Sequence, residues 1–277
     1  MTDFSRNPGR RLAFQSFEAT LGELSGRRGV TEIAFRDAWL DRLRSTGLLT
    51  LNGWYEPPPV GMAVLFGHDE DPRRISFKSL RLPENAPGAT EMDWNRGMMY
   101  AYCSPLDRTT GLASDFGVTL YFGRRPDVQE HFRRAYSATA ALLQEVGPHT
   151  RSTALLHRSQ AIFREANLLN TIASVTDSVP LDLGHSMPLL PPEELAATRV
   201  LTGPQQQRLR DARRFISTSA DWALSEEHQV TIEPQLISTH RPDLPQVSFH
   251  YVVAVTAAGV AVLREGDELL RRLDLAD

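Results

Sequence analysis

Cysteine and lysine are both nearly absent from this sequence of 277 residues. The single cysteine, Cys103, excludes internal disulfides and any zinc or iron–sulfur site built from a cysteine cluster, and it is typical of a reducing compartment. Lys78 is the only lysine, so 29 of the 30 basic side chains are arginine, which a GC-rich coding bias explains most simply. We therefore predict a cytoplasmic protein in which arginine would meet any anionic group of a substrate.

Long apolar runs and an excess of positive charge are missing as well. The longest nearly apolar stretch, residues 251–263, is 13 residues long and interrupted by Gly259, which is too short for a membrane span. The first twenty residues lack the apolar segment of a signal peptide. With 30 basic and 34 acidic side chains the net charge is −4, so no general basic surface exists to hold a phosphate backbone. These absences predict that the partners include neither membranes nor nucleic acids.

The composition that remains is that of a soluble globular protein, with 41% hydrophobic and 23% charged residues. No repeat or convincing linker divides the chain, so we expect one α+β domain over residues 1–277, with 1–10 as a loose tail. Apolar spacing predicts helices over 11–24, from residue 32 onward, and over 127–146, 152–167 and 205–224. Short apolar runs between turns predict strands over 62–66, 75–82, 97–103, 118–123, 229–237, 247–256 and 260–264.

Four ionisable residues lie on or beside the predicted buried strands, where an uncompensated charge is costly. They are Asp115, His185, Glu233 and His250. Taken singly, each has an ordinary explanation: a turn aspartate, a loop histidine, a glutamate on a solvated strand face and a satisfied core histidine. The arginine-rich face predicted over 205–224 is likewise better explained as solvated than as a substrate clamp.

The segments around these four residues occur in the order and approximate spacing of one family. They read SDFGVTLYFG at 114–123, GHS at 184–186, VTIEP at 230–234 and FHYVVAVTAAG at 249–259. Together they resemble the pita-bread metallopeptidases: methionine aminopeptidase, Xaa-Pro aminopeptidase, prolidase and relatives such as creatinase. The segment GVTE at 29–32 also resembles that family's first helix. The resemblance covers about residues 12–265 and implies an α+β fold with a curved antiparallel sheet, flanking helices and pseudo-twofold halves.

The resemblance also implies a metal centre. In the family, two Asp, one His and two Glu hold two divalent metals, and Asp115, His185 and Glu233 match three of these positions. The last Glu is replaced by His250. Because two carboxylates balance one dication, we predict a single iron, manganese, cobalt or zinc ion held by these four side chains, with the second metal lost.

The position of the family's first Asp falls at Cys103, twelve residues before Asp115, with Ser104 and Asp107 as alternatives. We therefore mark Cys103 as a possible replaced ligand position. An inward-facing thiol would be a soft ligand or a nucleophile, whereas a buried, inert cysteine is the more ordinary interpretation.

The family's upstream catalytic histidine has no counterpart among residues 80–86, and the arginine of the family's first block is Thr119 or Val118 here. His68 lies upstream but does not align. We predict a specialised metal-dependent enzyme that hydrolyses a C–N bond of a small amino-acid-like or short peptide substrate, with Glu233 and His185 as the catalytic residues.

Three alternatives remain open, and a homodimer is possible under each of them. A mononuclear iron site with histidine and carboxylate ligands suits redox or lyase chemistry, which oxygen consumption would separate from hydrolysis. A creatinase-like pocket would work without metal, through histidine acid–base chemistry. The altered ligands also suit a pita-bread pseudoenzyme that binds peptides or proteins without catalysis.

Overall fold

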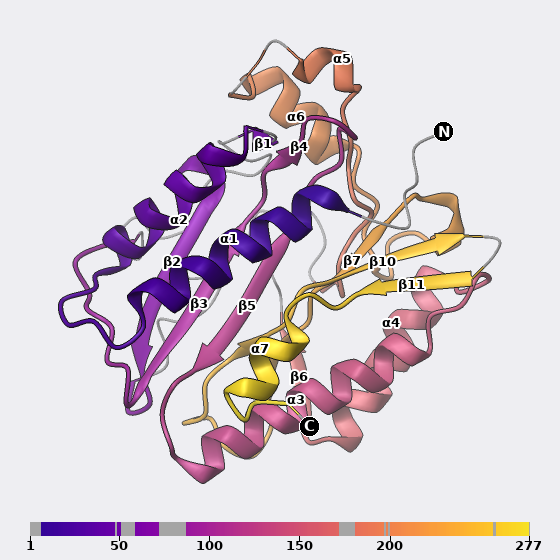
Figure 1. Ribbon diagram of the computed structural model, residues 1–277. Helices are drawn as coiled ribbons and strands as arrows, with labels where there is room; N and C mark the ends of the chain where they lie inside the picture. Colours follow the sequence, from indigo (N-terminus) through magenta and orange to yellow (C-terminus); the bar gives the residue numbers. More distant parts are fainter. Residues whose placement is uncertain are drawn as a thin grey trace.

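Helices flank short antiparallel sheets in the computed structural model of the chain (Figure 1). The structure describes residues 7–47, 49–50, 59–71, 87–171, 181–196, 198, 200–256 and 259–276. The strand predicted over 75–82 lies outside this range, as does the segment 80–86. Within the described part of the chain, no helix combines the length and the apolar character needed to cross a bilayer.

The first half of the chain is built on a three-stranded antiparallel sheet. Its order is β2 (Met62–His68), β3 (Gly97–Cys103) and β5 (Phe116–Tyr121), and every residue of β3 and β5 is buried. Helices α1 (Pro8–Leu24) and α2 (Glu32–Thr46) cover one face of this sheet (Figure 1). Their contact with it is aromatic: Phe116 on β5 packs against Phe17 and Trp39, with ring centroids 5.5 and 6.1 Å apart. A two-stranded ribbon, β1 (Leu49–Thr50) with β4 (Leu106–Asp107), lies beside the sheet.

The second half carries two further three-stranded antiparallel sheets. One has the order β6 (Leu168–Thr171), β8 (Gln235–Ser238) and β9 (Val247–Ser248), and the other β11 (Gly259–Leu263), β10 (Tyr251–Thr256) and β7 (Val230–Ile232). The long helices α3 (Pro126–Gln144) and α4 (Ser152–Glu165) belong to this half. The shorter helices are α5 (Pro192–Leu195), α6 (Gly203–Asp211) and α7 (Asp267–Arg272), with single turns at Pro59–Gly61 and Leu224–Glu226.

The two halves meet along β5. Val118 and Phe249 form an antiparallel bridge, and the backbone N–H of His250 donates to the carbonyl of Gly117 at 3.1 Å. Two residues further along β5, the hydroxyl of Thr119 accepts a hydrogen bond from the backbone N–H of Ser248 at 3.0 Å. This junction places the residues just before β5 next to the start of β10, which is where the chemistry of the molecule is concentrated.

The helix predicted over 205–224 is wrong in its second half. The helix α6 begins at a capping box between Thr202 and Gln205 and ends at Asp211. Beyond it, the N–H of Ile216 donates to the carbonyl of Gly184, and the N–H of Leu183 donates to the carbonyl of Ile216. The backbone groups that a longer helix would use internally therefore pair with the loop around His185.

The loose tail predicted over 1–10 is wrong for residues 7–10. Asn7 caps a helix that begins at Pro8, and the side chain of Arg10 is 3% exposed. Asn7 accepts from the backbone N–H of Arg10 at 2.9 Å, and proline at the first helical position is compatible with helix geometry. The segment is therefore a buried helix start.

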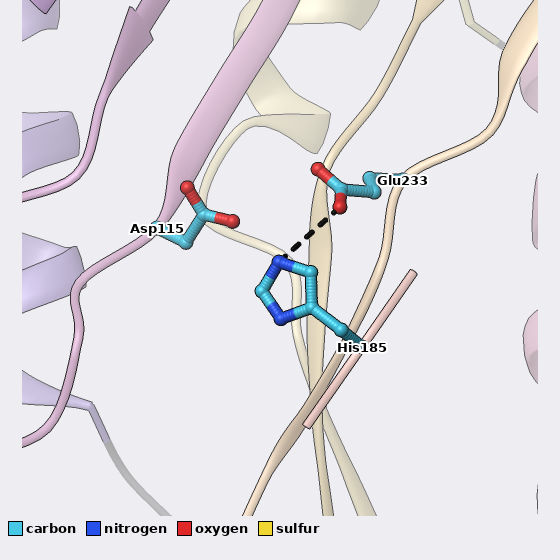
Figure 2. Close-up of side chains that lie close together, drawn as sticks. All are labelled: Asp115, His185 and Glu233. Atoms are coloured by element: carbon cyan, nitrogen blue, oxygen red, sulfur yellow. Dashed lines mark ion pairs between the residues drawn. The ribbon is translucent and has the colours of Figure 1, made fainter. Parts of the chain in front are cut away.

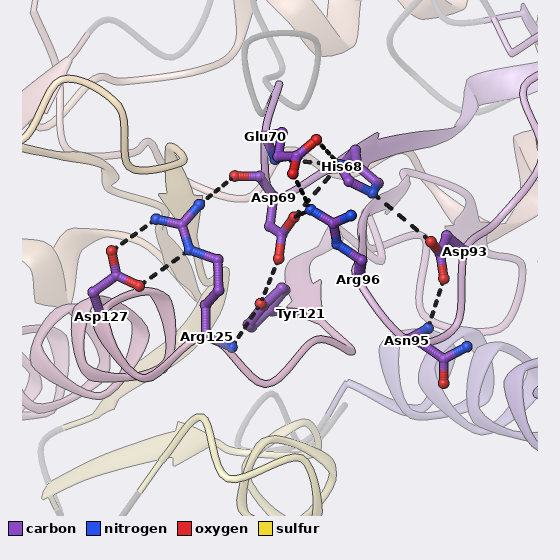
Figure 3. Close-up of polar contacts among 9 residues, drawn as sticks. All are labelled: His68, Asp69, Glu70, Asp93, Asn95, Arg96, Tyr121, Arg125 and Asp127. Atoms are coloured by element: carbon purple, nitrogen blue, oxygen red, sulfur yellow. Dashed lines mark hydrogen bonds and ion pairs between the residues drawn. The ribbon is translucent and has the colours of Figure 1, made fainter.

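A polar network closes the end of the first sheet away from the β5–β10 junction (Figure 3). The buried carboxylate of Asp69 accepts from the hydroxyl of Tyr121 at 3.1 Å and from Arg96 at 3.2 Å. Arg125 donates to the backbone carbonyl of Asp69 at 2.7 Å and to the carboxylate of Asp127 at 2.7 Å. Hydrogen bonds from Arg125, and then from Arg241, hold the pKa of Asp127 well below its usual range. The network joins the end of β2 to the start of α3.

Replacing Tyr121 by phenylalanine should weaken this network. The change deprives buried Asp69 of one donor and the backbone N–H of Arg125 of its acceptor, so we expect a loss of about 1 to 3 kcal/mol in the free energy of unfolding, measured by urea denaturation. Breaking the exposed Arg44–Asp41 pair with R44Q serves as the control, with a loss below about 0.5 kcal/mol. Equal losses in the two variants would show that the network is only a surface feature.

Candidate metal centre

Two carboxylates and one imidazole from distant parts of the chain converge at the junction of the two halves. They are Asp115, directly before β5, His185, in the loop at 181–190, and Glu233, directly after β7. Each offers one ligand atom, and these atoms lie within 4.8 Å of one another. Figure 2 shows the three side chains pointing toward a common centre. Asp115 and His185 are buried, whereas the side chain of Glu233 keeps 12% of its surface exposed.

Backbone pairing explains why His185 and Glu233 are neighbours. The N–H of Thr231 donates to the carbonyl of His185 at 2.8 Å, and the N–H of Glu233 donates to the carbonyl of Leu183 at 2.9 Å. The loop thus runs antiparallel beside β7. Gly184 adopts a φ of +143°, and a Cβ there would collide with the carbonyl of Thr231, so glycine is required between the paired segments.

His250 borders Glu233 on the side opposite His185. Its Nδ1 lies 3.4 Å from Oε2 of Glu233, while Nε2 of His185 lies 3.4 Å from Oε1. His250 is not part of the group of three within 4.8 Å, but it places the Glu233 carboxylate between two imidazole rings. Among the described residues, neither ring nitrogen of His250 has a hydrogen-bond partner, and the same holds for Oδ1 of Asp115. Buried polar atoms without partners indicate a site that is completed by something else.

Burial determines the charge states of these groups. It lowers the pKa of both His185 and His250 to about 3, with further lowering from Arg213 for His185 and from Arg10 for His250. Both rings are therefore neutral at pH 7. Burial raises the pKa of Asp115 to about 6, against the opposing effect of a hydrogen bond from Tyr102, so this carboxyl is still largely ionised at neutral pH.

The hydrogen bond at Nδ1 of His185 fixes the tautomer of this ring. Nδ1 lies 2.8 Å from the backbone carbonyl oxygen of Ser186, and a carbonyl oxygen can only accept. The proton of the neutral ring is therefore on Nδ1, and Nε2 presents a lone pair to Oε1 of Glu233. Nε2 of His185 and Oε1 of Glu233, 3.4 Å apart, are both atoms that can bind a metal ion. Neutral imidazole oriented by a carbonyl, next to carboxylate oxygens, is the donor set that divalent metals use, so the residues present fit such an ion.

Comparison with solved structures identifies the fold that carries this centre. Prolidase from Pyrococcus furiosus is 15% identical, with a TM-score of 0.61 over 92% of this chain and 60% of that protein. Xaa-Pro dipeptidase from Bacillus anthracis is 15% identical, with a TM-score of 0.59 over 91% of this chain and 57% of that protein. Methionine aminopeptidase from Rickettsia prowazekii is 13% identical, with a TM-score of 0.59 over 95% of this chain and 97% of that protein.

This chain has the pita-bread fold. The expectation of an α+β pita-bread architecture is thereby confirmed. The chain spans about 60% of the length of the prolidase and the dipeptidase, but nearly the whole length of the aminopeptidase. No family model matches the sequence. No curated protein matches it either.

The structure favours the ordinary interpretation of Cys103, a buried cysteine, over a replaced ligand position in this pita-bread sheet. Side chains alternate along β3, so Cys103 and Tyr102 point to opposite faces. Tyr102 hydrogen-bonds to Asp115 and interacts with the side chain of Ser104, and it thereby marks the face that carries the site. Burial raises the pKa of the Cys103 thiol well above its usual range, which disfavours the thiolate that binds metals. Ser104, one of the two alternatives, is the residue at the site-facing position.

Three residues around the centre escaped the sequence analysis. They are Tyr102, Arg10 and Arg213. The sequence predicts Arg213 on a solvated helix face, but the residue follows the end of α6, with its guanidinium 4.9 Å from the centre of the Phe215 ring. Its charge acts on both Asp115 and His185. The Phe215 ring in turn packs edge-on against His185, with centroids 5.9 Å apart. Only the break in the helix, which the sequence did not reveal, brings Arg213 there.

His68 does not join the centre. It lies at the end of β2 in the network of Figure 3, with Nε2 3.8 Å from Asp93 and Nδ1 3.4 Å from Asp69. No other group of three such side chains in the described ranges brings its ligand atoms as close together as the Asp115 group does.

Gly117 provides a test of the position of His250. A Cβ at residue 117 would lie 2.6 Å from Cε1 and 2.7 Å from both ring nitrogens of His250, so Gly117→Ala should push the ring out of place. We expect a loss of metal affinity of about tenfold, measured by cobalt(II) titration. Gly22→Ala is the control, because a Cβ at that position of α1 meets no atom within 4 Å. Unchanged affinity in G117A would show that His250 is not needed to hold the metal.

Proposed function

We propose that this protein is a metal-dependent hydrolase that cleaves a C–N bond in a small amino-acid-like or short peptide substrate. One divalent ion of iron, manganese, cobalt or zinc would be held by Asp115, His185, Glu233 and His250. The names of the similar structures, prolidase, Xaa-Pro dipeptidase and methionine aminopeptidase, support the class of bond. A cytoplasmic location and a homodimer remain predictions from the sequence.

The observation that carries the proposal is the convergence of Asp115, His185 and Glu233, whose ligand atoms lie within 4.8 Å of one another, beside a His250 ring whose nitrogens have no hydrogen-bond partner among the described residues. Carboxylate and neutral imidazole groups gathered in this way are the ligands that divalent metals use. The charge count supports a single ion, because Asp115 and Glu233 together carry −2 when both are ionised. A second dication would add +2 that no carboxylate of the group of three balances.

Individual side chains of the centre would have different roles in the hydrolysis. When bound, the ion would polarise the substrate carbonyl and lower the pKa of a water molecule. Glu233 is the partly exposed member of the group, so its carboxylate is placed to accept the proton of the attacking water and to return it to the leaving nitrogen. In that step a C–O bond forms, the C–N bond breaks and the amine leaves neutral. His185 stays fixed by its bond to Ser186, and Arg213 would be the cation that meets a substrate carboxylate.

Metal content and bond cleavage test the proposal together. The full chain would be stripped with chelator, reloaded separately with manganese, cobalt, zinc or iron(II), and analysed for metal per chain. We expect about one ion per chain, and release of amine from some member of a panel of dipeptides and N-acyl amino acids, both abolished by chelator. His185→Ala should lose both properties, whereas exposed His157→Ala on α4 should keep them.

Other outcomes identify the alternatives. Two ions per chain would contradict the single-metal site. Full activity in chelator would favour acid–base chemistry by histidine, and oxygen consumption with iron(II) would favour a redox enzyme. Stoichiometric metal with no turnover of any substrate would favour a binding protein.

A further inference from the structure

The first turn of α1 reaches into the junction between the two halves of the molecule. Arg10 is buried there, and three nitrogens of its guanidinium each donate a hydrogen bond to a different acceptor. Nη1 donates to the backbone carbonyl of Asp115, and Nη2 donates to the backbone carbonyl of His250 at 2.5 Å. Nε donates to the carboxylate of Glu265 at 3.2 Å, which compensates the buried charge.

The two carbonyls belong to residues that the fold brings together from opposite halves. Asp115 precedes β5 of the first sheet, and His250 precedes β10 of the second. Direct strand pairing holds His250 at its N–H, through the carbonyl of Gly117. Arg10 binds the carbonyls of the two site residues themselves, and it does so with a planar group whose donors have a fixed separation.

We propose that Arg10 is a positioning residue of the candidate metal centre, which sets the separation of Asp115 and His250 by binding both of their backbone carbonyls at once. The metal-binding part of this inference rests on the proposed function, whereas the geometric part does not. The guanidinium does not touch the reacting atoms, so its role is exerted through these two residues.

Neighbouring contacts hold Arg10 in this place. Asn7, the cap of α1, accepts from the backbone N–H of Arg10 and donates from Nδ2 to the carbonyl of Ala113 at 2.9 Å. The same Nδ2 donates to Oε1 of Gln229 at 3.0 Å, next to the strand that leads to Glu233. The ring of Phe116 lies under the guanidinium at 5.7 Å. The start of α1 is therefore hydrogen-bonded to the segments that carry three of the four candidate ligands, Asp115, Glu233 and His250.

Charge and geometry make different predictions for lysine at this position. Lysine keeps the positive charge but lacks the fixed pair of donors that binds two carbonyls. If Arg10 acts by positioning, Arg10→Lys and Arg10→Met should both disturb the site. If it acts only as a nearby charge, Arg10→Lys should behave like the native protein. Arg11→Met is the matched control, because Arg11 is the next residue of α1 and is exposed.

The experiment measures the site with and without metal. Cobalt(II) titration, followed by the visible absorption of the ion, gives the affinity and reports its ligand geometry. Nitrogen-15 NMR of the imidazole side chains, recorded on metal-free protein, reports the surroundings of His250 among the eight histidines of the chain. The His250 signals would be assigned by their loss in His250→Gln.

We expect R10K and R10M to bind cobalt about 10- to 100-fold more weakly, with a changed absorption spectrum. Both should shift the His250 signals and leave those of exposed His157 in place, and R11M should match the native protein. If the native protein binds no cobalt, the proposed function fails, and the His250 signals alone decide the role of Arg10.

A milder variant covers the case in which R10K and R10M do not fold. Glu265→Gln keeps Arg10 but removes the charge of its partner, and it should shift the same His250 signals by a smaller amount. His250 signals that match the native protein in every folded variant of Arg10 and Glu265 would overturn the inference, as would an R10K protein that behaves like the native one.

Discussion

Replacing Glu233 by glutamine is expected to abolish metal binding at concentrations that saturate the native protein. The amide has nearly the same shape as the carboxylate but carries no charge, so a single dication would be left with Asp115 as its only anionic partner in the group of three. We expect the affinity to fall by more than about 100-fold, beyond the range typical of residues that only support a ligand. Hydrolysis should be lost as well, because the same carboxylate is the proposed proton acceptor.

Thermal and chemical unfolding give a measurement that is independent of activity. At a metal concentration 100 times its dissociation constant, the native protein should gain about 3 kcal/mol in unfolding free energy. The E233Q protein should gain less than about 0.5 kcal/mol under the same conditions. Glu130→Gln, an exposed change on α3, should retain the full gain. An equal gain in E233Q and the native protein would remove Glu233 from the ligand set.

Asp115, His185 and Glu233 could be grouped from the sequence because the segments around them occur together in the order and approximate spacing of one family. Each stands at the end of a buried strand or beside a glycine, and the backbone of the His185 loop pairs with that of the Glu233 segment. Gly184, for example, is required by the close approach of its loop to Thr231, and the glycine precedes the histidine in the sequence pattern as well. Local pattern and tertiary structure agree at these positions, which is why the order of the blocks indicated the correct fold.

The errors have a different physical origin. The pattern over 205–224 is compatible with a helix throughout, but the backbone around Ile216 gains more from pairing with the loop around Gly184, about thirty residues away in sequence. The start of α1 is polar and charged, which resembles a tail. Arg10 is buried because acceptors more than 100 residues away, at Asp115 and His250, fit its donors. Hydrogen-bond partners that are so far apart in the sequence produce no local periodicity from which the structure could be predicted.

The register of β3 decides between Cys103 and its alternative Ser104. A shift of one residue along a strand moves a side chain to the opposite face of the sheet, so counting in the sequence cannot replace the observed alternation. The register of β3 with β5 pairs Cys103 with Phe116 and Tyr102 with Gly117. With Tyr102 bonded to Asp115 and interacting with Ser104, hydroxyl groups and no further carboxylate of the described residues occupy this side of the centre. This is consistent with a centre for one metal ion.

Acidification is expected to destabilise the metal-free protein strongly. His185 and His250 have pKa values of about 3 in the folded state, because of burial, against an ordinary value of 6.5. Between these values the unfolded chain binds protons that the folded protein does not, so the stability contributed by neutral histidines is complete above pH 6.5 and is lost as the pH falls toward 3. The buried His131, whose pKa is also lowered, acts in the same direction. Asp115 acts in the opposite direction between pH 6 and 3.8, because burial raises its pKa to about 6.

Two buried histidines outweigh one buried aspartate, so the net change from pH 7 to pH 4.5 should be a loss of about 3 kcal/mol in unfolding free energy. Urea denaturation in chelator at the two pH values measures it. His250→Gln removes one of the two titrating rings of the centre and should reduce the difference between the pH values markedly, whatever its effect on stability at pH 7. Exposed His157→Gln should leave the difference unchanged. A pH dependence that is the same in H250Q and the native protein would mean that His250 is not held neutral in the folded state, and the centre would then lack the lone pair that a fourth metal ligand needs.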